Sequence, residues 1–303
     1  MRAGEQRFFS RSIDISSVDK VFFPDDGLTK GDLIDYHARV AETMFQHLRG
    51  RPVAVKRYPD GLDGQGFFQK NAGSHFPGWV RREDIPKRDG GSLDHVVVDE
   101  PATLVYLADQ GAIEFHPWSS LAEDLEHPVE LILDLDPPDA DAVDAVRAGA
   151  RHVRRLLDDL EVPSRIKTSG SAGFHVHVPL DGSADWEESS ALARALAEAV
   201  CAQHPDELTT SQRKQTRTGR VFVDWLRNSY GQTSVAAYSV RARPGAPVAT
   251  PIDWDEVATV EPRSYHVRNL FRRLGQREDP WQEAPPAVAA AQLLDRVEAL
   301  RAR

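Results

Sequence analysis

Cysteine is almost absent from the sequence, and this narrows the chemistry that the chain can perform. The 303 residues include a single cysteine, Cys201, so no internal disulfide can form. Cys201 stands among small and apolar residues of a predicted helix, where we expect a buried and inert thiol. Redox chemistry is therefore not expected of this chain.

Long hydrophobic runs are absent as well. No stretch of about 18 apolar residues is present to span a bilayer, and residues 1–11 are polar and charged, unlike a signal peptide. Hydrophobic residues make up 41% and charged residues 28% of the chain, which is typical of a folded globular protein. We expect a cytoplasmic protein with no membrane partner.

The nucleotide-binding motifs of the commonest kinds are also missing. The sequence contains neither a Walker A motif (G-x-x-x-x-G-K-[ST]) nor G-x-G-x-x-G. P-loop NTPases and dinucleotide-binding domains depend on these glycine-rich turns to hold phosphates. The sequence therefore gives no motif support for either of these two classes of protein.

The net charge of -10 argues at first against nucleic acid, because phosphate binding depends on Lys and Arg. One segment departs from this balance. Between Leu208 and Gly245, Asp224 is the single acidic residue among seven basic ones: Arg213, Lys214, Arg217, Arg220, Arg227, Arg241 and Arg243. The imbalance indicates a polyanion site, although a solvated basic surface would give the same pattern.

Helical and strand patterns mix throughout the chain. Thr29 and Asp32 form a predicted capping box, and apolar residues at helical spacing predict a helix over 30–48. Further strands are expected over 52–57, 129–136, 165–168, 174–180 and 220–225, and further helices over 139–160, 189–204, 264–274 and 287–301. Residues 61–78 are predicted to be a loop, whereas the types of three short apolar segments (93–98, 102–108 and 112–116) stay open. We expect one α/β (mixed α+β) domain over 1–303, in which 280–303 form a Pro-rich linker and a helix packed on the body.

Two aspartates follow each other at strand spacing. A strand places Asp134 and Asp136 on one face and the leucines between them on the other. Like charges this close are costly unless a cation neutralises them, and Mg²⁺ and Mn²⁺ prefer carboxylate oxygens. The pair therefore predicts a metal site, against the alternative that an aspartate caps the following helix.

A third aspartate, Asp224, lies within the strongly apolar strand 221–225, where a lone carboxylate is expensive to bury without a partner. Three aspartates could hold two ions about 3.5 to 4 Å apart, as in phosphoryl transfer. The surrounding basic residues would then face phosphates.

A glycine- and serine-rich turn lies between the acidic strands, at residues 167–177. Its small residues permit a close backbone approach, and its N-H groups and hydroxyls could face phosphate oxygens. His175 and His177 share one face of the strand that follows. A plain turn with hydrogen-bonded histidines is the alternative interpretation.

Taken in order, these motifs resemble the archaeo-eukaryotic primase superfamily. The motifs are Asp134-Leu135-Asp136-Pro137, the turn from Thr168 to His175, and Val223-Asp224-Trp225. Within the superfamily the chain is similar to the polymerase domain of bacterial DNA ligase D and its stand-alone relatives. Further matching segments are residues 19–24, 28–30, 55–57, 67–70, 114–116 and 237–241. The resemblance implies a central mixed β-sheet flanked by helices.

The resemblance also implies a set of site residues. The metal ligands, for two Mn²⁺ or Mg²⁺ ions, would be Asp134, Asp136 and Asp224. The residues around the incoming nucleotide would be His116, Ser169, Gly170, His175, Arg217, Arg227 and Arg241. The DNA-binding residues would be Lys20, Lys30, Arg57, Phe67 and Phe68, with the lysines on a 5′-phosphate and the phenylalanines stacked on a templating base. A contact from His116 or Ser169 to the 2′-hydroxyl would favour ribonucleotides.

The implied activity is template-dependent extension of primer 3′-hydroxyl ends at gaps or breaks during DNA repair, at the bacterial nucleoid. The partners would be DNA with gaps, overhangs or primer-template ends, nucleoside triphosphates, and a separate DNA ligase or end-binding protein. One alternative is a module that holds gapped or broken DNA without efficient catalysis. A sugar-nucleotide transferase using the D-x-D pair is another, but it leaves Asp224 and the His175 turn unexplained.

The chain departs from the family pattern at three positions. Ala172 stands where a lysine usually reaches the triphosphate, and Arg227 stands where glutamine is common. Ser17 replaces an asparagine near the predicted 5′-phosphate site. We expect Arg227 to take over part of the phosphate contact.

Overall fold

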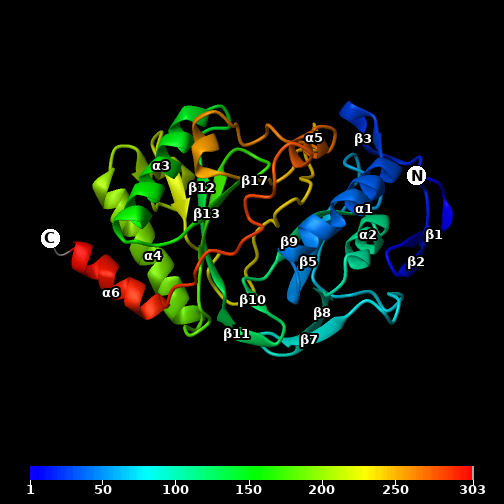
Figure 1. Ribbon diagram of the computed structural model, residues 1–303, viewed down its shortest axis with the longest axis horizontal. Coiled ribbons are helices and arrows are strands. Elements are labelled where there is room, and N and C mark those ends of the chain that lie inside the picture. Colours follow the sequence, from blue (N-terminus) through cyan, green and yellow to red (C-terminus); the bar gives the residue numbers. More distant parts are fainter. Residues whose placement is uncertain (302–303) are drawn as a thin grey trace. The chain divides into compact units, whose positions relative to one another are not determined.

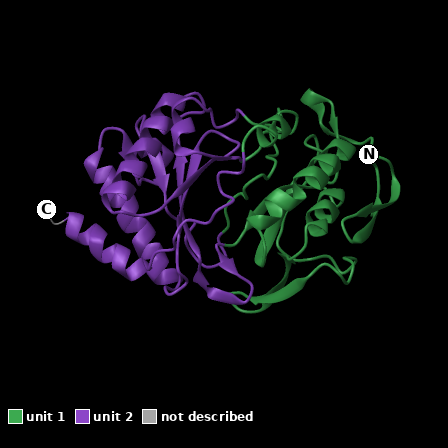
Figure 2. Cartoon of the chain, in the orientation of Figure 1, with its two compact units in different colours: residues 1–118, 233–249, 265–277 green, residues 119–232, 250–264, 278–303 purple. Residues whose placement is uncertain are grey.

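The computed structural model describes residues 1–301, which divide into two units built from discontinuous segments (Figure 2). Unit 1 comprises residues 1–118, 233–249 and 265–277, and unit 2 comprises residues 119–232, 250–264 and the C-terminal segment from Glu278. A single domain over 1–303 stays a prediction, because this division does not test whether either unit folds alone.

Unit 1 is built on a five-stranded sheet beside two helices. The sheet contains β5 (Arg51–Arg57), β6 (Phe67–Gln69), β7 (Arg82–Pro86), β8 (Ser92–Val98) and β9 (Ala112–Pro117), in the order β6-β5-β8-β7 with β9 also paired to β5. The helices α1 (Lys30–Gln46) and α2 (Ala102–Asp109) pack on each other. The remaining elements are the hairpin of β1 (Gly4–Phe8) and β2 (Arg11–Ile15), the pair β3 (Val21–Phe23) and β4 (Leu28–Thr29), the 3-10 turn η1 (Pro24–Asp26) and the short helix α5 (Leu270–Leu274).

The N-terminus of α1 confirms the predicted capping box. The Thr29 side chain accepts a hydrogen bond from the backbone N-H of Asp32, and the Asp32 carboxylate accepts one from the backbone N-H of Thr29. These reciprocal bonds satisfy two of the donors that a helix start leaves unpaired. They fix where the helix begins.

Unit 2 is built on a six-stranded mixed sheet in the order β15-β16-β12-β14-β13-β17, in which only β15 and β16 pair in parallel. Its strands are β12 (Glu130–Asp136), β13 (Arg165–Thr168), β14 (Phe174–Pro179), β15 (Leu208–Thr209), β16 (Val221–Asp224) and β17 (Pro251–Ile252). Its helices are α3 (Val143–Asp159), α4 (Trp186–Gln203) and α6 (Ala290–Arg301), and the 3-10 turns are η2 (Lys214–Thr216) and η3 (Trp254–Ala258). A small hairpin of β10 (Ser120–Leu121) and β11 (Asp124–Pro128) completes the unit. Figure 1 shows α3 and α4 beside the sheet, with α6 packed against α4.

The two faces of the unit 2 sheet have different chemistry. Leu131, Leu133 and Leu135 alternate along β12 and are fully buried, as the strand period predicted. Helix α3 packs closely on the neighbouring strands, because a Cβ on its Gly149 would lie 3.3 Å from the side chain of Val221. The apolar face is thereby covered, and the acidic side chains stand on the opposite face.

Several boundaries differ from the predicted ones. Helix α3 begins at Val143 rather than at 139, because residues 139–142 form a turn in which the Asp139 side chain accepts the N-H of Asp141. The helix predicted over 264–274 is confined to Leu270–Leu274, since the backbone of Tyr265 instead accepts a hydrogen bond from Val248. The predicted loop 61–78 contains β6, which pairs with β5.

None of the helices in the described part of the chain is long and apolar enough to cross a lipid bilayer.

Candidate active site

Four charged or ionisable side chains form one row across the unit 2 sheet. The strand register pairs Asp224 of β16 with Asp134 of β12, Asp134 with His175 of β14, and His175 with Lys167 of β13. Directly paired residues in a sheet point to the same face. Asp136 lies two residues from Asp134 on that face, so three carboxylates gather at the end of β12 and β16.

The electrostatics of these carboxylates suit a bound cation. Burial, followed by the charges of Asp134 and Asp224, raises the pKa of Asp136 to about 7, although Arg217 and Arg227 oppose the shift. Burial also raises the pKa of Asp224, against the hydrogen bond that its carboxylate accepts from the N-H of Leu226. Keeping all of these carboxylates ionised is therefore costly unless a cation compensates their charge. Oxygen donors of this kind suit Mg²⁺ or Mn²⁺.

Lys167 is a component of the site that the sequence interpretation missed. Its side chain is fully buried, and its Nζ lies 3.0 Å from Nδ1 of His175. On the other side of the ring, Nε2 of His175 lies 3.3 Å from Oδ1 of Asp134. His175 is thus held between a buried cation and a candidate metal ligand. The sequence did offer one sign of this role, because Lys167 lies inside a predicted strand and has no acidic neighbour in the sequence.

The glycine- and serine-rich turn lies directly against β12. The Ser169 hydroxyl accepts hydrogen bonds from the N-H groups of Ser171 and Gly173, at 3.1 Å each. A Cβ at Gly173 would lie 1.9 Å from the carbonyl oxygen of Leu135, so only glycine permits this approach. The turn that contains Ser169 and Gly170 is therefore held against the strand that carries the acidic pair.

An arginine reaches this turn from another part of the chain. Nε of Arg263 donates a hydrogen bond to the carbonyl oxygen of Ser171 at 2.9 Å, and the Arg263 side chain is exposed. Ala172, the position without the usual lysine, adjoins that carbonyl. Arg263 thus brings a positive charge to the part of the turn where Ala172 replaces the usual lysine.

A cavity of about 280 Å³ opens next to Asp136. It is lined by Asp136, Pro137, Pro138, Asp139, Ala140, Lys214, Arg217, Thr218 and Gly219. The Arg217 guanidinium lies 3.9 Å above the ring of Phe222, which pairs with Asp136 across the strands. Thr218, in the lining of this cavity, adopts a φ of 45°, a strained conformation for a β-branched residue.

Arg227 stands at the other end of the acidic row. Its Nε lies 3.8 Å from Oδ2 of Asp224, and the side chain is 44% exposed. This separation is that of a loose ion pair, so Arg227 is available to a phosphate.

The predicted nucleotide residues His116 and Arg241 belong to unit 1, where they share one carboxylate. Oε2 of Glu114 lies 3.0 Å from Nε2 of His116 and 3.4 Å from Nε of Arg241. Although burial opposes ionisation, the hydrogen bond with His116 and the charge of Arg241 lower the pKa of Glu114 to about 2. Glu114 therefore orients both residues.

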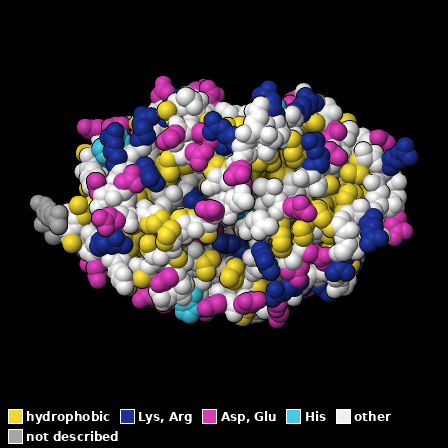
Figure 3. Space-filling view, in the orientation of Figure 1, with side chains coloured by type: hydrophobic (Ala, Val, Ile, Leu, Met, Phe, Trp, Pro, Cys, Tyr) yellow, Lys and Arg dark blue, Asp and Glu magenta, His cyan; other side chains and the backbone are white. Residues whose placement is uncertain are grey.

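An aromatic and basic surface lies on β5 and β6 of unit 1. Phe67 and Phe68 are 45% and 54% exposed, and they pair across the strands with Arg57 and Lys56. Arg57 is half-buried: its Nε donates to the carbonyl oxygen of Gln110 at 2.6 Å, and burial lowers its pKa. Exposed rings beside cations suit the stacking of bases. Basic and acidic side chains are interspersed on the face seen in Figure 3, despite the net negative charge.

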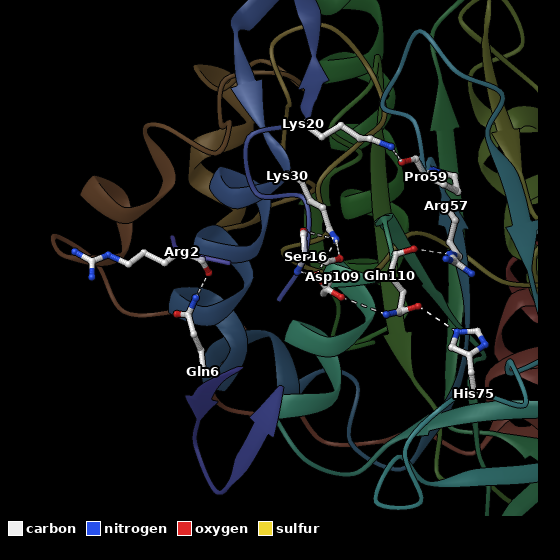
Figure 4. A network of polar contacts seen from close by, with 10 residues as sticks. All are labelled: Arg2, Gln6, Ser16, Lys20, Lys30, Arg57, Pro59, His75, Asp109 and Gln110. Atoms are coloured by element: carbon white, nitrogen blue, oxygen red, sulfur yellow. Dashed lines mark hydrogen bonds and ion pairs between the residues drawn. The ribbon is translucent and has the colours of Figure 1, made fainter. Parts of the chain in front are cut away.

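The predicted 5′-phosphate lysines both have protein partners (Figure 4). Nζ of Lys30 lies 2.7 Å from Oδ1 of Asp109 and donates to the backbone oxygen of Ser16, and the Lys30 side chain is only 7% exposed. Nζ of Lys20 donates to the backbone oxygen of Pro59 at 3.0 Å, as Figure 4 shows. It also donates to Oδ1 of Asp60 at 2.8 Å, and the Lys20–Asp60 pair is exposed. The network continues from Asp109 through Gln110 to His75. Lys20 is therefore much the more accessible of the two.

The fold and the carboxylate row define a nucleotidyltransferase of the primase-polymerase class, and comparison with known proteins identifies the family. The LigD primase-polymerase domain matches residues 29–281, so the chain belongs to this family. The solved polymerase domain from Mycobacterium tuberculosis Ligase D in complex with DNA aligns with a TM-score of 0.82 and 32% identity, covering 88% of this chain and 96% of that one.

Longer proteins show the same relationship. The multifunctional non-homologous end joining protein LigD of Pseudomonas aeruginosa is 35% identical over 285 residues, which cover 93% of this chain and 34% of that protein. The bifunctional non-homologous end joining protein LigD of Bacillus subtilis is 30% identical over 272 residues, which cover 89% and 43%. The chain thus spans about a third to two fifths of the length of these relatives.

Proposed function

We propose that this chain extends primer 3′-hydroxyl ends with nucleoside triphosphates at template gaps and breaks, and that it favours ribonucleotides. The observation that supports the proposal most directly is the strand register. It sets Asp224 opposite Asp134, with Asp136 on the same face and a cavity beside it to which Lys214 and Arg217 contribute. Metal-binding carboxylates next to cations are what nucleotidyl transfer requires.

The metals would be two Mn²⁺ or Mg²⁺ ions held by Asp134, Asp136 and Asp224. The ions would lower the pKa of the attacking hydroxyl and stabilise the leaving pyrophosphate. The raised pKa of Asp136 supports this assignment, because a cation removes the cost of ionising the carboxyl group.

The remaining side chains would bind and orient the nucleotide. Arg217, Arg227 and Lys214 would bind phosphate oxygens, and the turn at Ser169 and Gly170 would supply N-H and hydroxyl donors. Their positions beside Asp136 and Asp224 support these roles. The basic residues His175, His116 and Arg241 would complete the contacts to the nucleotide, with His116 near its sugar.

The DNA contacts would come from unit 1. Phe67 and Phe68 would stack on a templating base, and Arg57 would add charge to the same surface. A 5′-phosphate would replace Asp60 as the partner of Lys20. Lys30 would contribute its charge while it stays bridged to Asp109.

The proposed biological setting is end joining or gap repair at the bacterial nucleoid. Relatives with names that refer to non-homologous end joining support this setting. We propose that a DNA ligase and an end-binding protein act together with it.

The test is extension of a labelled primer across a short gap with a 5′-phosphate, in Mn²⁺ or Mg²⁺ and with ribo- or deoxynucleotides. We expect templated extension by the wild type and none by Asp134→Ala or Asp224→Ala. Asp124→Ala, which removes an exposed carboxylate on β11, is the matched control and should extend normally. Tight gap binding without extension under any condition would instead favour a binding module.

A further inference from the structure

A second group of candidate metal ligands lies in unit 2, on elements other than those that carry the three aspartates. His152 comes from α3, His204 is the C-cap residue of α4, and Glu207 precedes β15. Each offers one ligand atom, and these atoms all lie within 4.8 Å of one another. We propose that this His152 cluster, defined by these three residues, is a binding site for a zinc-like transition metal ion.

The two histidines are arranged in a way that core packing does not explain. Their rings stack with centroids 3.5 Å apart and planes inclined by 24°. Both residues are partly exposed rather than core residues, and Nε2 of His152 lies 3.2 Å from Oε2 of Glu207. Two imidazoles and a carboxylate are thus brought together from three separate elements.

The two histidine side chains are of a type that binds metals, and the ring of His152 can rotate toward an ion. Both histidine side chains are partly exposed, and neutral imidazole is the commonest metal ligand in proteins. Nδ1 of His152 is buried and has no hydrogen-bond partner among the described residues. Rotating this ring toward an ion therefore breaks one hydrogen bond, the contact with Glu207, and shifts the stack on His204.

The donor set selects the ion. Imidazole nitrogen with one carboxylate suits Zn²⁺ and its neighbours, whereas Mg²⁺ and Mn²⁺ prefer all-oxygen sites such as the aspartates. Ligand bonds of about 2.0 to 2.1 Å require donor atoms about 3.4 Å apart in a tetrahedron. The three ligand atoms lie within 4.8 Å of one another, so the side chains must move closer together. Glu207 is exposed and His204 partly so, which allows this. Three protein ligands leave the fourth position to water.

Ion binding here would stabilise the strand that carries Asp224. The carbonyl oxygen of Glu207 accepts a hydrogen bond from the N-H of Val221 at 2.8 Å, and β15 pairs with β16 immediately afterwards. An ion would link α3, the end of α4 and this strand edge. The C-terminal end of α4 adds a favourable partial charge for a cation. The cluster therefore acts as a structural clamp rather than as part of the transfer reaction.

The experiment is zinc titration of the EDTA-treated chain by calorimetry in excess Mg²⁺, which saturates the aspartates, with the visible absorption of Co²⁺ as a report on coordination geometry. We expect one zinc equivalent and a rise in melting temperature, because zinc binds the folded state. His204→Ala and Glu207→Gln should weaken zinc binding about tenfold or more, since loss of even an outer partner costs that much. His127→Ala, a surface histidine paired with Asp124, is the matched control.

Two further outcomes separate this proposal from the polymerase function. Asp224→Ala should retain the zinc equivalent, and the clamp can exist whether or not the chain extends primers. Unchanged zinc affinity in both His204→Ala and Glu207→Gln, or no zinc binding by the wild type in Mg²⁺, would overturn the proposal. These variants change partly or fully exposed side chains, so their folding is not at risk.

Discussion

Nζ of Lys167 lies 3.0 Å from Nδ1 of His175 in the interior of the unit 2 sheet. An ammonium group has only donors, so Nδ1 must accept and the ring proton must sit on Nε2. Nε2 lies 3.3 Å from Oδ1 of Asp134. The buried lysine therefore sets both the tautomer and the orientation of a histidine beside the candidate metal ligands.

Replacing this lysine should impair turnover more than folding. We expect Lys167→Met to lower kcat about 100-fold, because a small misplacement of a positioned group costs this much. Single-turnover extension measures the loss, and ¹⁵N shifts of His175 should report mixed tautomers. Lys87→Met, at an exposed lysine, is the control. Normal kcat with an unchanged His175 spectrum would contradict the assignment.

Neutralising Asp136 should stabilise the metal-free protein while abolishing extension. The pKa of Asp136 is raised to about 7, so its folded-state contribution to stability is present below its unfolded pKa and lost as pH rises through 7. Asp136→Asn should therefore raise the free energy of unfolding by about 1 to 3 kcal/mol at pH 8 in EDTA, with little gain at pH 4. Urea unfolding measures this, with Asp89→Asn as an exposed control. If Asp136→Asn instead lowered the free energy of unfolding at pH 8, the ionised Asp136 carboxylate would not be destabilising the folded protein, which would contradict the account.

Glu114 should affect stability with the opposite dependence on pH. Its pKa is lowered to about 2, so it contributes stability above its unfolded pKa that is lost as pH falls toward 2. Glu114→Gln should cost about 2 to 3 kcal/mol at pH 7, and the difference should shrink in unfolding curves at pH 3.5. Glu42→Gln, on the exposed side of α1, is the control and should leave the free energy of unfolding unchanged at both pH values. A cost that does not vary with pH would argue for lost packing instead.

Arg263 is predicted to take over the triphosphate contact of the lysine that usually stands at the position of Ala172. Arg263→Ala should raise the KM for nucleoside triphosphates about tenfold with little change in kcat, as expected when a phosphate contact is lost equally in ground and transition states. Ala172→Lys should restore the KM in the Arg263→Ala background. Arg151→Ala, an exposed arginine on α3, is the control. If Arg263→Ala leaves the KM unchanged, its contact with Ser171 is only structural.

Local patterns predicted the helix from Lys30, the strand faces of β12 and the proximity of its two aspartates, because capping and strand period are local properties. The family was also reached from sequence, through the order of its motifs, and the comparisons confirm it. Segment 102–108 could not be typed, since α2 is buried on every side and has no amphipathic pattern.

The missed residues depend on register and on long-range contacts. Lys167 meets His175 only because β13 pairs with β14 in one register, and a slip of one residue would turn it to the other face. Arg263 reaches the turn at Ser171 across 92 residues. The pairing of Lys30 with Asp109 could not be predicted from the sequence either, because the two residues are 79 positions apart.

The most direct test of the central claim is anomalous diffraction at the manganese edge from crystals grown with Mn²⁺ and a non-hydrolysable ribonucleoside triphosphate. The account predicts manganese peaks bound by carboxylate oxygens of Asp134, Asp136 and Asp224 at about 2.0 to 2.2 Å, with the triphosphate against Arg217. An ordered triphosphate with no manganese at these aspartates would contradict it.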